Sequence, residues 1–298
     1  MLTRRTDLAL EAFELWRESA EATTRLTGVR SRERASDGYP VTKVEILNRR
    51  GEAALGRPVG TYVTIDLSAY WKRTPDFFPR AVRATGRALK AMLPRTDGAV
   101  LVVALGNADM TPDSVGPLAA QSVLVTRHLI ADMPRQFAGF RPVAAFRTGV
   151  LGATGVETAE AVRGLAERIR PALVIAIDAL ASRRGARLCN TVQLSDTGIL
   201  PGSGVGNHRS ALDRKSLGVP VLAIGVPTVV DAVTLAADLL EEHGQTLNET
   251  ALRTGHGGLM VTPQDIDAKV RELAKVVGYG VNWALQDLEV EDISSLLA

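Results

Sequence analysis

The sequence predicts an α/β protein with three α/β/α layers: a mostly parallel central sheet, plus a smaller antiparallel strand pair from the N-terminal region. AVLVVALG at 99–106 and ALVIAI at 172–177 are apolar on both faces, as is typical of strands covered by helices on each side. Such runs are followed by a Gly- or Asp-bearing loop and an amphipathic helix, the order of stacked βαβ units. No repeat or linker interrupts the 298 residues, of which 46% are hydrophobic, so we expect one domain over 1–298.

The N-terminal part has a different character. A helical pattern runs from about Asp7 to Thr24, with apolar side chains among charged ones. KVEIL at 43–47 and TYVTIDL at 61–67 then alternate with period two. We expect these two segments to form the antiparallel pair.

The rest of the chain alternates strands and helices. Strand 172–177 is expected to end at Asp178, and a Gly-rich loop, SDTGILPGSGVGN, occupies 195–207. The predicted strands are 99–105, 142–147, 172–177, 187–194 and 219–226, and the predicted helices are about Ser114–Ile130, Val156–Ile169, 229–242 and 264–286.

Composition and charge exclude several classes of protein. With 35 basic and 33 acidic residues, the chain has no broad positive field for nucleic acid. The first sixteen residues carry charges throughout and do not form a secretory signal, and no apolar run approaches the roughly 20 residues of a membrane span. Cys189 is the single cysteine, so no disulfide framework forms within the chain. We expect a cytoplasmic location, with no membrane or direct nucleic-acid partner.

Two aspartates stand where ligands bind in open α/β sheets, beyond the carboxyl ends of strands. Asp113 follows strand 99–105 in the loop GNADMTPD, and Asp178 directly follows ALVIAI. Each also has a structural interpretation, because Asp113 precedes a predicted helix and Asp178 precedes ALASRR, so either side chain is placed to cap a helix N-terminus. Spacing alone leaves both interpretations open.

If both aspartates face one crevice, their chemistry follows. Two neighbouring carboxylates do not both ionise easily, so one holds a proton while the other remains anionic. The anion then takes a proton from water as the water attacks an amide carbonyl, and the acid protonates the carbonyl oxygen or the leaving nitrogen. This is the arrangement of an aspartic peptidase.

Other motifs give weaker signals. GSGVGN at 202–207 and GVLGATG at 149–155 match neither the P-loop nor the dinucleotide-binding spacing, so a turn or a peptide cradle competes with a phosphate site. The four histidines form no H-x-x-x-H or H-E-x-x-H pair, although a mixed Asp/His metal site across distant loops stays open. The signals for a nucleophilic residue are also weak. Ser195 and Ser203 lie outside G-x-S-x-G, and Cys189 falls in a predicted strand.

Several long segments carry a family resemblance. ALGNADMTPDSVGPLAAQSVLVTRHL at 104–129, GVLGATGVET at 149–158 and the stretch 174–235, which begins VIAIDALASRRG, closely resemble the spore germination protease family. The resemblance resumes at LMVTPQDID, 259–267, and touches RTDLALE at 5–11.

The resemblance implies an endopeptidase that begins the degradation of small acid-soluble spore proteins during germination. It implies an atypical aspartic peptidase in the cytoplasm of the spore core, with no cofactor and no metal. The family motifs TPD-(A/S)-(L/V)-GP and AIDALA place the essential aspartates on Asp113 and Asp178. The resemblance further implies a homotetramer made as a zymogen that removes its own short N-terminal segment.

The N-terminus contains a sequence similar to the family's cleavage sites. Thr6-Asp7-Leu8-Ala9-Leu10-Glu11 follows the order of T-E-(F/I)-A-S-E, so we expect self-cleavage between Asp7 and Leu8, with 1–7 as a short pro-segment. The acidic residues around that bond either lie on a solvated helix face or have cationic partners. The expected substrate-binding residues are Arg183, Arg184, Arg187, Gly202 and Gly204.

Two alternatives compete with this hypothesis. One is a metal-dependent endopeptidase of the hydrogenase-maturation type, which shares an α/β architecture and uses acidic and histidine ligands. The other is a non-catalytic regulator whose glycine loops bind phosphate or nucleotide.

Overall fold

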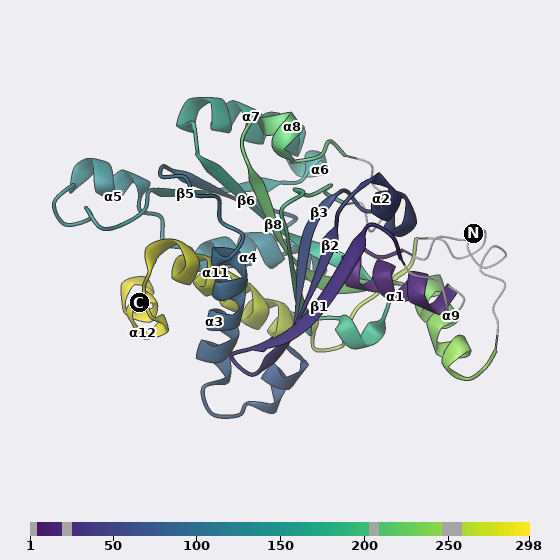
Figure 1. Ribbon diagram of the computed structural model, residues 1–298. Coiled ribbons are helices and arrows are strands. Elements are labelled where there is room, and N and C mark those ends of the chain that lie inside the picture. Colours follow the sequence, from purple (N-terminus) through teal and green to yellow (C-terminus); the bar gives the residue numbers. More distant parts are fainter. Residues whose placement is uncertain (1–4, 20–25, 203–208, 246–257) are drawn as a thin grey trace.

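One sheet organises the protein (Figure 1). The computed structural model describes residues 5–19, 26–202, 209–245 and 258–298. Within them the strand order is β1-β2-β3-β7-β8-β6-β4-β5, with β9 paired to β8. The strands are β1 (Val29–Ser36), β2 (Tyr39–Ile46), β3 (Gly60–Asp66), β4 (Val100–Leu105), β5 (Val143–Gly149), β6 (Leu173–Ser182), β7 (Thr191–Ser195), β8 (Val221–Asp231) and β9 (Met260–Val261).

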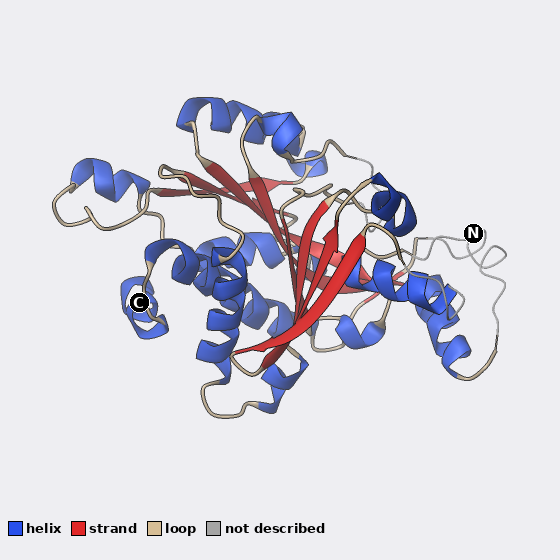
Figure 2. Ribbon diagram, in the orientation of Figure 1, coloured by secondary structure: helices blue, strands red, loops and turns tan. Residues whose placement is uncertain are grey.

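Helices lie on both faces of this sheet (Figure 2). The α-helices are α1 (Ala9–Ser19), α2 (Arg49–Leu55), α3 (Phe77–Lys90), α4 (Val115–Ala119), α5 (Arg127–Asp132), α6 (Leu151–Thr154), α7 (Thr158–Ile169), α8 (Arg214–Leu217), α9 (Ala232–Glu242), α11 (Ile266–Gln286) and α12 (Val290–Leu297). Short 3-10 turns are η1 (Ser68–Lys72), η2 (Thr111–Asp113), η3 (Ala120–Ser122) and η4 (Gly185–Arg187).

The sheet has a parallel half and an antiparallel half. β5, β4, β6 and β8 pair in parallel, whereas β1, β2, β3 and β7 pair antiparallel and join the same sheet through β7 and β8. The predicted α/β/α fold is therefore confirmed, and the expected N-terminal strand pair proves to be part of the main sheet. β1, which the sequence did not predict, is rich in charged residues and mostly exposed, so it lacks the apolar alternation of a typical strand.

Each face of the sheet has its own apolar core. On one face, α3, α4 and α11 cover the strands, and Val102, Ile175 and Ile224 lie fully buried among helix residues. On the opposite face, α7 packs over Leu101, Val103 and neighbouring side chains. Burial on both faces explains why these strands read as continuous apolar runs.

The helix expected from Ser114 to Ile130 is broken. Its residues form α4, then η3 directly after it, and then α5, with an extended stretch between η3 and α5. At the break, the side chain of Asn282 on α11 accepts from Leu124 N (2.8 Å), and Thr126 Oγ1 accepts from Val143 N (2.9 Å). These distant partners replace helical hydrogen bonds, and the local sequence does not reveal them.

The strand expected to end at Asp178 continues to Ser182. β8 has 11 residues against 10 in β6 and pairs with β6 as far as Ser182↔Val230, so the sheet extends past the aspartate. Asp178 is therefore an interior strand residue and caps no helix. Cys189 corrects a second expectation, because it precedes β7 instead of lying within it. Burial raises the pKa of its thiol to about 12, which agrees with an inert cysteine.

Candidate active site

Asp113 and Asp178 line the same cleft, which has a volume of about 490 Å³. Its walls come from the loop after β4, from β6 and β8, and from the segment around Leu200. Asp7, from the N-terminal segment, also lines it. The fold thus brings together three acidic residues that lie far apart in the sequence.

Asp178 lies deep in the sheet. It is 6% exposed, and its Oδ1 accepts from Ala179 N at 2.9 Å. Burial raises its pKa well above the ordinary value, and the charges of Asp113 and Asp7 raise the pKa further. The Ala179 N–H and the Arg209 guanidinium act in the opposite direction. Asp178 is therefore the member of the pair that holds a proton most readily.

Asp113 is held at the cleft by its loop. Its side chain is half-buried, and Oδ2 accepts from Asn107 N at 2.8 Å, so it does not cap the following helix. Thr228 on β8 donates to Pro112 O at 2.6 Å and fixes the loop to the sheet. Burial raises the pKa of Asp113, while the Asn107 N–H and Arg209 lower it. With these partners Asp113 is the better candidate for the anion.

Gly106 brings the Asp113 loop close to β4. Its φ is +108°, and a Cβ there would lie 2.0 Å from the Asp113 carbonyl oxygen. We expect Gly106→Ala to displace Asp113 and, on the expectation that Asp113 is one of two catalytic aspartates, to slow peptide cleavage by roughly 10²-fold, because a misplaced group loses much of its effect. Gly218→Ala is the matched control, since Gly218 also has a positive φ (+73°) but no atom within 4 Å of the added Cβ. Equal rates in peptide-cleavage assays of the two variants would contradict the prediction.

The N-terminal segment lies against the end of β6, where Asp7 lines the cleft. Asp7 N donates to Ala181 O at 2.8 Å, and Ala181 N donates to Asp7 Oδ2 at 2.8 Å. Leu8 is fully buried, and its N–H donates to Thr6 Oγ1 at 3.0 Å. The Arg57 guanidinium donates to the Thr6 carbonyl oxygen. These contacts fix the Asp7–Leu8 peptide bond next to the end of β6, with Asp7 at the cleft.

Gln193 on β7 contacts the backbone on both sides of Leu8. Its Nε2 donates to Asp7 O at 3.1 Å, and its Oε1 accepts from Ala9 N at 2.8 Å. Neither Gln193 nor Arg209, which lines the cleft, was predicted from the sequence. No local signal marks Gln193, since its partners lie more than 180 residues away in the sequence.

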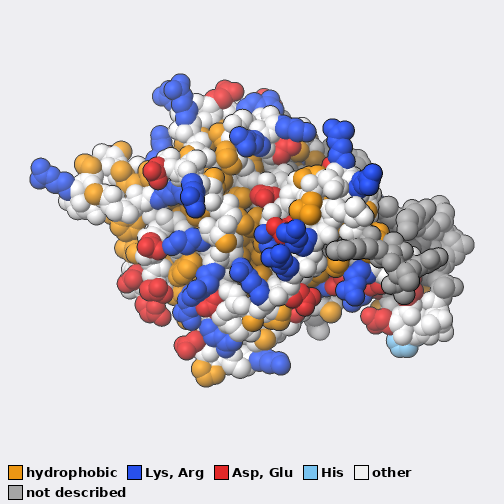
Figure 3. Space-filling view, viewed as in Figure 1, with side chains coloured by type: hydrophobic (Ala, Val, Ile, Leu, Met, Phe, Trp, Pro, Cys, Tyr) orange, Lys and Arg blue, Asp and Glu red, His pale blue; other side chains and the backbone are white. Residues whose placement is uncertain are grey.

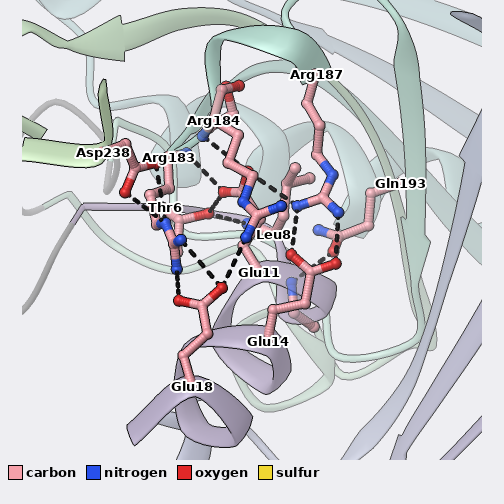
Figure 4. A network of polar contacts seen from close by, with 12 residues as sticks. Thr6, Leu8, Glu11, Glu14, Glu18, Arg183, Arg184, Arg187, Gln193 and Asp238 are labelled. Atoms are coloured by element: carbon pink, nitrogen blue, oxygen red, sulfur yellow. Dashed lines mark hydrogen bonds and ion pairs between the residues drawn. The ribbon is translucent and has the colours of Figure 1, made fainter. Parts of the chain in front are cut away.

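The three predicted arginines hold α1 (Figure 4). Glu11 is fully buried and accepts from Arg183 N (2.6 Å) and Arg184 N (3.0 Å), while Arg187 Nη1 lies 3.1 Å away. Arg187 also pairs with Glu14, and Arg183 and Arg184 both pair with Glu18. Thr6 donates to Glu11 as well. The structure thus places these side chains against the glutamates of the chain itself instead of leaving them on a solvated face.

The predicted glycines have mixed outcomes. Gly202 lines the cleft near Arg209. Gly204 and the candidate Ser203 lie outside the described residues. The other candidate serine, Ser195, ends β7 and donates to Gly198 O at 3.3 Å.

Lys and Arg side chains lie among Asp and Glu side chains over the face seen in Figure 3. In the part of the chain that the structure describes, His, Cys, Asp and Glu side chains form no group of three that could hold a metal ion. Of the described helices, none combines the length and apolar character needed to cross a membrane.

Known proteins match this chain over nearly its whole length. A family model described as germination protease matches residues 9–253. The germination protease of Caldanaerobacter subterraneus subsp. tengcongensis is 43% identical, with 98% of each chain covered. That of Clostridium tetani is 38% identical, with 98% of this chain and 99% of the relative covered. That of Bacillus cytotoxicus is 35% identical, with 94% and 93% covered.

Among solved structures, a NiFe hydrogenase maturation protease from Thermococcus kodakarensis matches with a TM-score of 0.36 and 16% identity, over 65% of this chain and 99% of that one. A likeness of this size carries no functional argument. The family match does not favour the two alternatives, a metal-dependent maturation endopeptidase and a phosphate- or nucleotide-binding regulator. With a family model over most of its length and full-length relatives at 35–43% identity, the chain belongs to the germination protease family and is a protease.

Proposed function

We propose that this protein is an aspartic-type endopeptidase that cuts its own chain between Asp7 and Leu8. The observation that carries the proposal is that Asp7, the residue before that bond, lines the cleft that holds Asp113 and Asp178. Backbone hydrogen bonds to Ala181 and Gln193 fix it there. Catalysis by a carboxyl pair needs one acid and one base, and the surroundings of these two aspartates separate their proton affinities in that sense.

The reaction uses the two carboxyl groups in turn. Anionic Asp113 takes a proton from water as the water oxygen bonds to the carbonyl carbon of Asp7. The bond between that carbon and Leu8 N then breaks, and the nitrogen takes the proton that Asp178 held. A proton passing from Asp113 to Asp178 restores the starting state.

The contacts of the bound segment also indicate a substrate preference. Leu8, Ala9 and Glu11 are all fully buried, and we infer that substrates carry an apolar residue, a small residue and an acid at the same positions after the cut. The backbone N–H groups of Arg183 and Arg184, with Arg187, supply the contacts for the acid. Gly202, which lines the cleft, is proposed to border the peptide. We assign the same contacts to protein substrates.

The family resemblance extends the proposal to the biological setting. The substrates are the small acid-soluble spore proteins, and the enzyme acts as a single-domain subunit of a homotetramer in the spore cytoplasm. It is made as a zymogen, with 1–7 as the pro-segment.

The test is self-processing followed by intact-protein mass spectrometry. We expect a product that begins at Leu8, with the mass of residues 1–7 lost, and no such product from Asp113→Asn. A second arm adds a purified small acid-soluble spore protein, with and without a chelator, and maps the products. An unprocessed or differently cut N-terminus would overturn the self-cleavage site, and activity lost with chelator and regained with zinc would favour a metal-dependent enzyme.

A further inference from the structure

The side chain of Gln193 contacts the N-terminal segment on both sides of Leu8. The side-chain amide donates to the carbonyl oxygen of Asp7 and accepts from the N–H of Ala9. Both contacts are to backbone, so they hold whatever side chains a bound peptide carries. Gln193 as a residue is 7% exposed, and the exclusion of water strengthens its hydrogen bonds.

The sheet places Gln193 level with Asp178. Gln193 on β7 pairs with Gly225 on β8, and Gly225 pairs with Asp178 on β6. Adjacent strands lie about 4.8 Å apart, so the two backbone positions are roughly 10 Å apart. Gly225 has no side chain of its own, and the Leu180 side chain lies over it, since a Cβ at Gly225 would lie 2.4 Å from Leu180.

We propose that Gln193 stabilises the negative charge that develops on the Asp7 carbonyl oxygen during cleavage. This inference rests on the proposed function, because it takes the Asp7–Leu8 bond as the one cut. As the water oxygen bonds to the carbonyl carbon, the C=O electron pair moves to the oxygen, and the Nε2–H group already in place stabilises that charge. The Oε1 contact with Ala9 N keeps the amide oriented and keeps the peptide from turning about Leu8. Asp178 is then free to supply its proton to the leaving nitrogen.

The decisive variant is Gln193→Glu, which keeps the shape and the acceptor but loses the donor while ionised. A protonated Glu donates again through O–H. The charged or titratable side chains lining the adjoining cavity of about 300 Å³ are Asp7, Arg57, Tyr62 and Asp213, and Asp178 lies level on β6. Full-length wild type and variant are compared at pH 5 and pH 8, both for self-processing and for cleavage of an added peptide of residues 5–14.

We expect Gln193→Glu to lower kcat for the added peptide by about 10²- to 10³-fold at pH 8, with a smaller change in KM. The wild-type rate divided by the variant rate should be roughly tenfold smaller at pH 5 than at pH 8, because Glu gains its proton at the lower pH. Gln193→Met, which lacks donor and acceptor, should show the loss at both pH values. Expressing each rate relative to wild type at the same pH removes the pH dependence of the aspartates.

Gln286 provides a matched control. It lies on α11 and is also 7% exposed. Its side-chain amide likewise makes two hydrogen bonds to backbone, accepting from Arg141 N (2.9 Å) and donating to Arg141 O (3.0 Å). Gln286→Glu should lower stability without changing kcat at either pH.

The outcomes separate the two proposals. If Gln193→Glu cleaves like wild type while Asp113→Asn and Asp178→Asn are inactive, the role of Gln193 is wrong and the aspartate mechanism stands. If Gln193→Glu loses the same fraction of the cleavage rate at both pH values, the loss is purely structural and the role of Gln193 is wrong. The same conclusion follows if Gln286→Glu loses activity in the same way. Activity in Asp113→Asn or Asp178→Asn would overturn the proposed function itself.

Discussion

Asp178→Asn is expected to lower the rate of self-processing by about 10³-fold or more while making the fold more stable. Asn keeps the oxygen that accepts from Ala179 N, so the local hydrogen bond survives. It has no proton to give to the leaving nitrogen, so cleavage fails. Mass spectrometry of the N-terminus measures the first effect, and Asp113→Asn should share it. Asp66→Asn, at an exposed position on β3, is the control.

The stability gain depends on pH in a defined direction. Because burial raises the pKa of Asp178 above its ordinary value of 3.8, the folded protein binds the proton more tightly than the unfolded chain does. The wild-type free energy of unfolding therefore falls as pH rises from that value through the folded pKa, and it stays lowered above it. The Asn variant has no such loss, so its advantage should be larger at pH 8 than at pH 5, on the order of 1–3 kcal/mol. Urea unfolding at both pH values measures this difference, and a less stable Asn variant at pH 8 would contradict it.

Glu11→Gln is expected to release the N-terminal segment from the cleft. Both Glu11 oxygens accept hydrogen bonds, from the N–H groups of Arg183 and Arg184, and Arg187 pairs with the charge. Gln has one oxygen, so its NH₂ group would face an N–H donor in a fully buried place. We expect a loss on the order of 2–3 kcal/mol in holding the segment, and self-processing slower by roughly 10²-fold.

Cleavage of an added peptide that keeps the acidic residue should be unchanged or faster in Glu11→Gln, because the cleft is then less occupied. Glu14→Gln is the matched control: its side chain is 25% exposed and bonds Arg187, so it should slow self-processing far less. A Glu11→Gln protein that processes itself at the wild-type rate would show that these contacts do not position the segment.

The sequence predicted those parts of the site that depend on short-range patterns. Asp113 and Asp178 follow apolar runs, and the expectation that both line one cleft is met, although Asp178 lies inside β6 and not at its end. The break between α4 and α5 was not predictable, since it depends on Asn282 on a distant helix. Gln193 was equally hidden, because its partners are set by the fold.

The arginine contacts lie between these cases. Glu11, Glu14 and Glu18 recur at intervals of three and four residues, which places them on one helix face. Three arginines at 183–187 offered the complementary charge. What the sequence does not contain is the route by which the N-terminal segment returns to the end of β6, because a tertiary contact between such distant segments depends on the whole sheet.

The position of α1 has a kinetic consequence. The helix that follows the proposed cut is covalently part of the enzyme, so after cleavage it remains a tethered product next to its own binding site. A short tether corresponds to an effective concentration in the millimolar range. A free protein substrate at micromolar concentration competes poorly against this effective concentration of the tethered helix. The slow step of the first turnover is therefore bond cleavage, and the slow step of later turnovers is departure of the helix.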